Sequence, residues 1–222
     1  TADPRIVTKA KLIEEITYDE MLEMASSGAR VLMARSVEFG RRYNVPIIVK
    51  PTFSEGSGTI VKDKVMEQAI VSGVTHNDKE IKFTLFGVPD QPGIAGKVFG
   101  PLSENGVIVD MIVQNVSKES KTDISFTAPL EQKSEVENIL ENLSTELEAE
   151  GADSDPNIAR VSLIGAGMKA ESGIASKMFS ILGENKINIA MISTSPIRIS
   201  CVVNKDDMQK AIDSLHKEFI EA

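Results

Sequence analysis

The 222-residue sequence contains little of what several protein classes require. No apolar run approaches the roughly 20 residues that a helix needs to cross a bilayer, and no signal-peptide pattern opens the sequence. Lysine and arginine total 24 against 33 aspartate and glutamate, a formal charge of −9. Because nucleic-acid binding needs clustered positive charge, we expect neither a nucleic-acid partner nor a membrane partner.

Residues that carry metal, redox or phosphate chemistry are also scarce. The single cysteine, Cys201, has no disulfide partner in the chain, which fits a reducing cytoplasm. It lies in an apolar run, so we expect a buried packing residue. His76 and His216 have no acid or nucleophile spaced around them, and the sequence holds no Cys/His metal spacing and no phosphate loop. The sequence therefore predicts no catalytic and no metal-binding residues.

What the sequence does contain is an internal repeat. Residues 83–112 (the first repeat) resemble residues 161–192 (the second repeat). Gly87 recurs as Gly165, 78 residues later, whereas the later matches are 80 residues apart, which places a two-residue insertion in the second loop. The chain therefore contains one supersecondary unit twice. The matches at a spacing of 80 begin at Gly93, Ile94, Ala95, Lys97, Phe99, Glu104, Asn105 and Met111.

Each repeat predicts the order strand, helix, strand, strand, helix, which is five-sixths of a ferredoxin-like domain. Asn105-Gly106 and Asn185-Lys186 mark the exits of the first helices, because Asn and Gly tolerate a positive φ. The second helices follow from apolar residues at helical spacing after residues 133 and 207. The expected strands are residues 81–87, 107–116 and 122–127 in the first repeat, and 160–165, 187–194 and 197–203 in the second.

The second repeat lacks the sixth element, a closing strand, because the chain ends just after its last helix. A strand-like run without a partner, residues 68–75, stands upstream and is followed by a turn at Asn77-Asp78. We infer that this run completes the sheet of the second repeat, so that the first domain is inserted in the second. The alternative is a hairpin between residues 68–75 and residues 81–87 within the first domain.

The chain before residue 66 alternates helix and strand without a repeat. Thr17 stands three residues before Glu20, a capping-box pattern that predicts a helix start. A second amphipathic helix is expected over residues 34–43 and short strands over 45–49 and 59–61. The turn-rich stretch 53–57 is the expected linker.

The loop before the first helix of each repeat is the best candidate site. In the first repeat Pro92 fits the first helical turn and Gly93 allows a close backbone approach. The N–H groups and dipole of the helix favour an anion such as an α-carboxylate, and Asp90 beside them suits an α-ammonium. This pairing predicts a free amino acid as ligand. The alternative, equally open at this point, is that Asp90 only caps the helix.

The repeats resemble ACT domains, the small-molecule-sensing modules of amino-acid metabolism. Nearly the whole chain resembles aspartate kinases, because several segments match that family in order. They read TADPRIV from residue 1, YDEMLEMASSGARVL from 18, RSVEFGRRYNVPI from 35, DMIVQNVS from 110, VSLIGAGM from 161 and ISTSPIRIS from 192.

The resemblance implies an α/β (α+β) fold of tandem ferredoxin-like βαββαβ ACT domains, the first inserted in the second, behind the C-terminal remnant of an amino-acid-kinase domain. Residues 1–61 would be that remnant and linker, 81–157 the first ACT domain, and 66–76 with 158–222 the second. Asp3 and Arg5 would be remnants of the nucleotide site.

The resemblance also implies effector sites for lysine and/or threonine between ACT domains. Pro196 stands where family members often carry an acidic residue, so we expect unequal sites, with the first loop the better one and threonine slightly favoured. The first site would comprise Asp90, Gly93, Ile94, Ala95 and Gln114 with Asn188 and Ile189. The related pocket would use Ser117, Met168, Gly173, Ile174 and Ser195.

The implied function is feedback inhibition of aspartate phosphorylation by a cytoplasmic regulatory chain. ATP and magnesium would serve the complete kinase (ATP:L-aspartate 4-phosphotransferase), and this chain alone would hold no cofactor and no catalytic site. The expected partners are a catalytic α subunit and a second copy, in a homodimer formed through ACT domains; a truncated kinase is equally compatible. The alternatives are a free-standing ACT-type amino-acid-binding module and, less supported, an independent enzyme.

Overall fold

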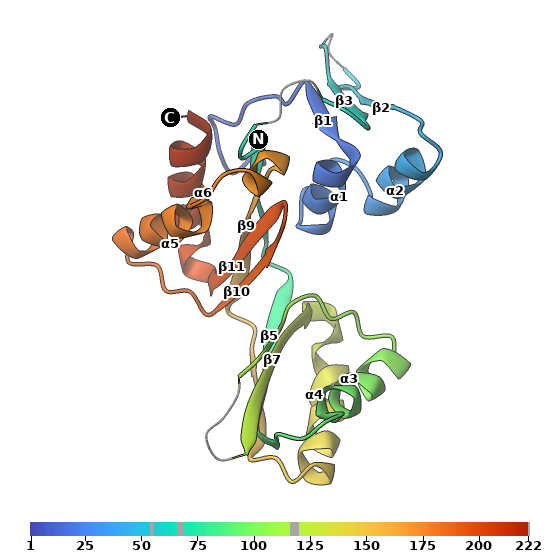
Figure 1. The fold of residues 1–222 in the computed structure, drawn as a ribbon, viewed down its shortest axis with the longest axis vertical. Helices are drawn as coiled ribbons and strands as arrows, with labels where there is room; N and C mark the ends of the chain where they lie inside the picture. Colours follow the sequence, from blue (N-terminus) through green and yellow to red (C-terminus); the bar gives the residue numbers. More distant parts are fainter. Residues whose placement is uncertain (54–55, 66–68, 116–119, 222) are drawn as a thin grey trace. The chain divides into compact units, whose positions relative to one another are not determined.

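The computed structural model describes residues 1–53, 56–65, 69–115 and 120–221. The chain forms two compact units (Figure 1). The split unit comprises Thr1–Asn77 and Ala159–Ala222, and the inserted unit comprises Asp78–Ile158. Across the described ranges, no helix is long and apolar enough to cross a membrane.

The amino-terminal segment of the split unit, residues 1–65, builds a small sheet with two helices. Strand β1 (Glu15–Thr17) leads into helices α1 (Tyr18–Ser26) and α2 (Ala34–Arg42), and strands β2 (Ile47–Val49) and β3 (Thr59–Lys62) follow. The sheet order is β1-β3-β2. The capping box at the start of α1 is confirmed, since the Thr17 hydroxyl accepts from the Glu20 N–H and the Glu20 carboxylate accepts from the Thr17 N–H.

The prediction that residues 53–57 form a linker is wrong. Strands β2 and β3 on either side of it pair antiparallel, with Ile48 opposite Ile60. The stretch therefore joins two strands of one sheet, and it contains residues 54–55, which lie outside the described residues. Turn composition marks a chain reversal but does not distinguish a hairpin from a domain boundary.

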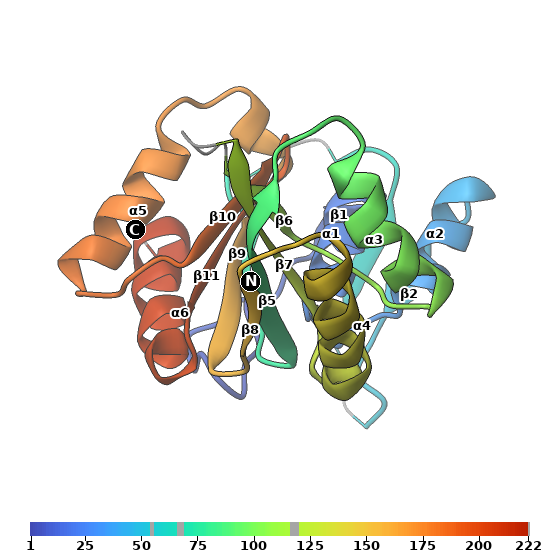
Figure 2. The ribbon, with the colours of Figure 1, turned by 90° about the horizontal axis from the view of Figure 1, so that it is seen from below.

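The rest of the split unit is a ferredoxin-like domain. Strands β4 (Gly73–Asn77), β9 (Ile158–Ile164), β10 (Met191–Ser195) and β11 (Arg198–Asn204) form a sheet in the order β10-β11-β9-β4. Helices α5 (Ile174–Glu184) and α6 (Met208–His216) lie together on one face of it (Figure 2). Strand β4 pairs antiparallel with β9, Thr75 opposite Ser162, so the upstream strand completes this sheet as inferred, over residues 73–77.

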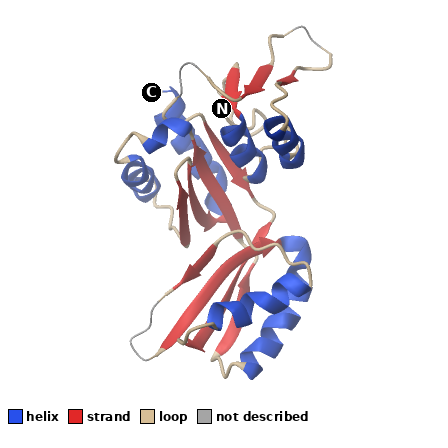
Figure 3. Ribbon diagram, turned by 45° about the vertical axis from the view of Figure 1, so that its right-hand side comes forward, coloured by secondary structure: helices blue, strands red, loops and turns tan. Residues whose placement is uncertain are grey.

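The inserted unit repeats the same architecture with its own closing strand, the sixth element of the fold. It contains β5 (Glu80–Pro89), α3 (Ile94–Glu104), β6 (Ile112–Gln114), β7 (Lys121–Pro129), α4 (Lys133–Glu146) and β8 (Gly151–Asp155). The sheet order is β6-β7-β5-β8, with both helices on one face (Figure 3). Because β5 pairs with β7 and β8, the alternative hairpin between residues 68–75 and 81–87 is wrong.

Each domain has its own apolar core. In the inserted unit Phe83 stacks on Phe126 with ring centroids 5.4 Å apart, and Phe99 meets Phe126 edge-on. In the split unit Cys201 is fully buried in β11 among aliphatic side chains, as its apolar setting predicts, and burial raises the pKa of its thiol to about 12. His216 is a fully buried histidine whose ring nitrogens contact the Thr1 hydroxyl and the Glu221 carboxylate.

The helix exits confirm the turn but correct its mechanism. Asn105 and Asn185 keep a negative φ, and each donates its side-chain N–H to the carbonyl four residues earlier, at 2.8 and 2.9 Å. The residues after them, Gly106 and Lys186, take the left-handed conformation, with φ of 71° and 60°. The asparagines therefore act as hydrogen-bond donors rather than as positive-φ residues.

Candidate functional site

The loop of the first repeat presents an uncapped helix end. Helix α3 begins after Gly93, which has a φ of 90° and no atom within 4 Å of a Cβ placed there. No side chain caps the helix, and the N–H groups of Ala95 and Gly96 have no hydrogen-bond partner among the described residues. Asp90 is exposed beside this turn. The structure therefore disfavours the alternative that Asp90 caps α3.

Asp90 and Gln114 lie at the same end of their sheet. Strand β5 ends at Pro89 opposite Lys121, and the Asp90 N–H donates to the Ser120 carbonyl at 2.8 Å. Strand β6 ends at Gln114, opposite Ile124 of the shared neighbour β7. Both side chains are exposed there. Ile94, in contrast, is buried in the core, and its N–H already donates to the Gln91 carbonyl, so it offers a ligand little beyond position.

A carboxylate that the sequence did not single out shapes this loop. Strand β5 carries a bulge between Leu85 and Val88, at which Gly87 has a φ of 62°. The Gly87 N–H donates to the Asp123 carboxylate of β7 at 2.9 Å. Asp123 thus fixes the strand immediately before the loop. It lies in an alternating strand whose other polar residues look similar, so the sequence carries no signal that distinguishes it.

The loop of the second repeat has the same helix start with different chemistry. Helix α5 follows Gly173, whose φ of 92° and open surroundings match those of Gly93. It too has no side-chain cap, and Ile174 and Ala175 donate no N–H to any described residue. A short 3-10 turn, Ala166–Lys169, fills the loop, and Met168 in it is buried in the domain core. Met168 can therefore offer a ligand only its backbone.

The remaining expected residues of the second repeat lie at strand ends. Asn188 is exposed and Ile189 half-buried just before β10. Ser195 ends β10, and its hydroxyl accepts from the Ile197 N–H across the turn to β11. Ser117, the remaining residue of the expected second pocket, lies outside the described residues. The residues expected from the two repeats belong to different units, so the shared pockets stay a prediction.

Asp3 and Arg5, expected as nucleotide-site remnants, bind each other. Arg5 donates from Nη2 to Oδ2 of Asp3 at 2.6 Å and from Nε to Oδ1 at 3.0 Å. This hydrogen-bonded pair lowers the pKa of the Asp3 carboxyl to about 2. Both groups are thus held charged close to the chain start, and their nucleotide role stays a prediction.

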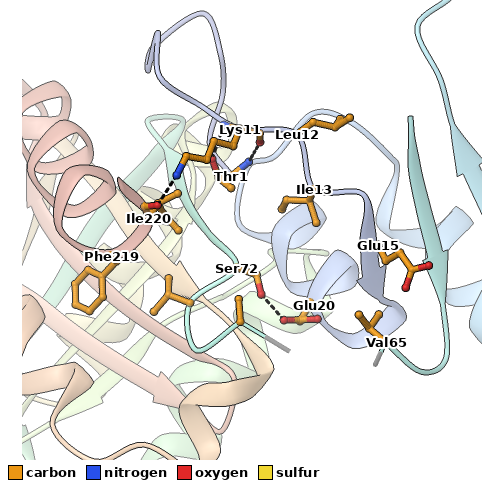
Figure 4. Close-up of a pocket in the computed structure, with 12 residues that line it drawn as sticks. Thr1, Lys11, Leu12, Ile13, Glu15, Glu20, Val65, Ser72, Phe219 and Ile220 are labelled. Atoms are coloured by element: carbon orange, nitrogen blue, oxygen red, sulfur yellow. Dashed lines mark hydrogen bonds between the residues drawn. The ribbon is translucent and has the colours of Figure 1, made fainter. Parts of the chain in front are cut away.

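A cavity of about 340 Å³ lies within the split unit (Figure 4). Its walls come from the amino-terminal segment, from the stretch before β4 and from the last turn of the chain, and include Lys11, Glu20, Ser72 and Phe219. Lys11 closes one side by donating to the Ile220 carbonyl at 2.9 Å. The sequence did not predict this cavity, because its lining residues are scattered along the chain. No cluster of three metal-ligating side chains occurs within the described part of the chain.

Comparison with known families defines the class of protein. The ACT domain model matches residues 82–148, a second ACT domain model matches 161–219, and the amino acid kinase family model matches 1–51. The two ferredoxin-like domains are therefore ACT domains, as the resemblance implied, and they follow a segment that matches the amino acid kinase family.

Individual relatives narrow the class to one enzyme family. Aspartate kinase of Pseudomonas putida is 46% identical over 99% of this chain and 54% of its own length, and aspartokinase of Mycobacterium tuberculosis is 42% identical over 99% and 53%. The ligand-free regulatory subunit of Thermus thermophilus aspartate kinase is 37% identical, with a TM-score of 0.64 over 68% of this chain and 99% of that one. The chain belongs to the aspartate kinase family and is its ACT-containing regulatory region. It spans about half the length of the curated relatives it matches.

Proposed function

We propose that this chain regulates a cytoplasmic aspartate kinase, and that lysine and/or threonine bound at its ACT domains lowers aspartate phosphorylation. Two structures of E. coli aspartokinase III, 25% identical to this chain, support allosteric regulation in a related enzyme. One holds aspartate and ADP in an R-state, and the other holds lysine and aspartate in a T-state. The kinase reaction, with its ATP and magnesium, would belong to a catalytic part that includes or accompanies this chain.

The observation that carries the proposal is the unused helix start beside an exposed carboxylate. At α3 the Ala95 and Gly96 N–H groups have no partner among the described residues, and a Cβ placed on Gly93 would meet no atom within 4 Å. The positive helix end attracts a carboxylate, and Asp90 nearby attracts an ammonium group. A free amino acid carries both of the complementary charges. Gln114, at the same end of the sheet but two strands away on β6, would add a polar contact.

The second repeat would take part without the Asp and Pro of the first loop. Gly173 and Ile174 reproduce the helix start, but Ala170-Glu171-Ser172 replaces the sequence around Asp90 and Pro92. We therefore propose that the first loop binds the effector more tightly. Family resemblance adds the remaining residues of the proposed sites, which are Asn188, Ile189, Ser117, Met168 and Ser195.

We also propose a homodimer formed through ACT domains, with a catalytic α subunit as the other partner. Strand β6 lies at the edge of its sheet and carries the exposed Ile112, and Ile108 precedes it with 71% of its surface exposed. An apolar sheet edge offers hydrogen-bonding groups and area to a second copy. A crystal structure of aspartokinase α and β subunits, whose matching chain is 36% identical, supports a two-subunit arrangement.

The second candidate function is a free-standing ACT-type amino-acid sensor. It would bind the same ligands but regulate another protein. The amino acid kinase match over residues 1–51 favours the kinase assignment, because a free sensor needs no such segment.

Calorimetric titration of lysine and of threonine tests the proposal. Asp90→Ala should weaken binding by about 2–5 kcal/mol if Asp90 pairs with a desolvated ammonium group. Its stability should change by less than about 0.5 kcal/mol, because Asp90 caps no helix. Gln114→Ala should weaken binding less, and the two changes should be non-additive if both contact one ligand. Glu104→Ala, an exposed charge at the other end of α3, is the matched control.

Two outcomes would contradict this account. If Asp90→Ala binds as tightly as the wild type, the ligand does not use the first loop. If neither amino acid binds the folded chain at millimolar concentration, the effector proposal fails.

A further inference from the structure

A buried carboxylate connects the amino-terminal segment to the loop of the second repeat. Glu20 is only 3% exposed, and its two oxygens have different partners. Oε2 accepts from the Thr17 hydroxyl at 2.7 Å and from the Thr17 N–H at 3.3 Å. Oε1 accepts from the Ser72 hydroxyl at 2.5 Å and from the Ala166 N–H at 2.9 Å, the former drawn in Figure 4.

The capping box alone does not explain this arrangement. A capping box needs one side-chain oxygen, and glutamine serves as well as glutamate. A buried carboxylate is costly unless hydrogen bonds compensate for lost water, so the contacts of Oε1 stabilise a charge that helix capping does not require. Only a carboxylate supplies both acceptors at once. Glu20 therefore joins three segments that are far apart in sequence: α1, the stretch before β4, and the loop after β9.

The loop that Glu20 holds is tightly tied on its other sides. The Gly165 N–H donates to the Ile197 carbonyl at 3.1 Å, and the Gly167 N–H donates to the Ala69 carbonyl at 3.3 Å. A Cβ at Gly165 would lie 2.2 Å from the Ile70 carbonyl oxygen, so the backbones are in direct contact. A loop held this closely cannot shift at one point without moving its neighbours.

The two repeats differ at this point. In the first repeat the strand end before the loop is held by Asp123, a carboxylate of the same domain, which accepts from Gly87. In the second repeat the matching glycine is Gly165, and the N–H of the next residue, Ala166, donates to Glu20 of the amino-terminal segment. The first loop is thus anchored within its own sheet, whereas the second is anchored to the segment that matches an amino acid kinase.

We propose that Glu20 is the positioning residue that couples the loop of the second ACT domain to the kinase segment. A rearrangement of residues 165–168 changes the acceptor geometry at Oε1, and the first turn of α1 responds because Oε2 of the same carboxylate completes its cap. The coupling itself rests on the contacts above. Its use in regulation rests on the proposed function, namely that an amino acid binds at this loop.

Amide exchange measured by NMR on the chain without ligand tests the coupling. Met168→Ala opens a cavity under the loop and should speed exchange of the Ala166 amide and of the α1 amides at positions 20–22, each by about tenfold. In a Glu20→Gln background, the same change should speed exchange at Ala166 but not at positions 20–22. Leu215→Ala, a cavity in the same core on α6, corrects for general loss of stability. Ser72→Ala removes one donor with little risk to folding and should weaken the coupling in part.

Coupling is refuted if Met168→Ala leaves positions 20–22 unchanged, or if its effect there persists in Glu20→Gln. A second set of measurements adds lysine or threonine at millimolar concentration. The ligand should protect residues 166–169 and 20–22 in the wild type, and only 166–169 in Glu20→Gln. Absence of protection by both amino acids would contradict binding at this loop, while the ligand-free comparison would still decide the coupling.

Discussion

The two repeats end their first helices with the same turn but different residues, which makes a reciprocal exchange informative. Gly106 and Lys186 follow the capping asparagines of α3 and α5 and have φ values of 71° and 60°. Their N–H groups donate to equivalent carbonyls, Ser103 and Gly183, at 3.0 and 2.8 Å. The backbones are thus alike, and only the side chain differs. We predict that Lys186→Gly stabilises the chain and that Gly106→Lys destabilises it.

The magnitude follows from two opposing terms. A non-glycine residue in the left-handed region costs roughly 1–2 kcal/mol relative to glycine. The greater freedom that glycine gives the unfolded chain offsets about 0.4–1 kcal/mol of this difference. Lys186 is exposed, so its side chain contributes little packing. The net gain from Lys186→Gly should be about 0.5–1 kcal/mol, and the loss from Gly106→Lys should be similar.

Differential scanning calorimetry measures both effects and shows which transition moves. At roughly 2–4 °C per kcal/mol for a chain of this size, Lys186→Gly should raise Tm by about 1–4 °C and Gly106→Lys should lower it by a similar amount. The double variant should be close to the wild type if the sites act independently. A lower Tm for Lys186→Gly would refute the reasoning, since it would show that the turn does not strain the lysine.

Three further predictions concern the core, a tight turn and assembly. Because burial raises the Cys201 pKa from 9.0 to about 12, the unfolded chain loses this proton at a lower pH than the folded chain. The free energy of unfolding should therefore fall by about 1.4 kcal/mol per pH unit above pH 9. Urea titrations of the wild type and of Cys201→Ala isolate this slope. Gly28→Ala should lower the free energy of unfolding by more than about 2 kcal/mol, because φ at Gly28 is +104° and a Cβ there would lie 2.0 Å from the His76 carbonyl oxygen. Gly100 lies in a helix with open space around it, so Gly100→Ala should raise the free energy of unfolding by about 0.4–1 kcal/mol in the same urea assay. Light scattering at micromolar concentration should give twice the chain mass of 24.1 kDa, and a monomer with and without amino acids would contradict the proposed homodimer.

Much of the fold was predictable because the sequence states it twice. Two copies of one pattern predict the element order, and the strand-like run upstream of them was expected to complete the second sheet. The pairing of β4 with β9 confirms that inference. The short hairpin between β2 and β3 was not predictable, since residues 53–57 carry turn signals that fit a linker equally well.

The two candidate loops were predictable from the sequence, but the side chains that hold them in place were not. Gly93 and Gly173 directly precede helices α3 and α5, in the loops that the sequence singled out, and their left-handed conformation is a finding of the structure. The roles of Asp123 and of Oε1 of Glu20 were not predicted, because their hydrogen-bond partners lie on other strands and loops. Periodicity and capping rules describe neighbours in sequence, whereas these carboxylates act on backbone groups brought close only by the folded sheet.

The insertion of one domain within another bears on the order of folding. Strand β4 must find β9 across the whole inserted unit, since Asn77 pairs with Arg160. The inserted unit is continuous in sequence, and its own end strands already bring Lys82 opposite Asp155. Once it has folded, the chain between β4 and β9 behaves as a short connection, and a roughly tenfold shorter loop lowers the closure cost by about 2 kcal/mol. The inserted domain should therefore fold first, and the sheet that surrounds it in sequence should close afterwards.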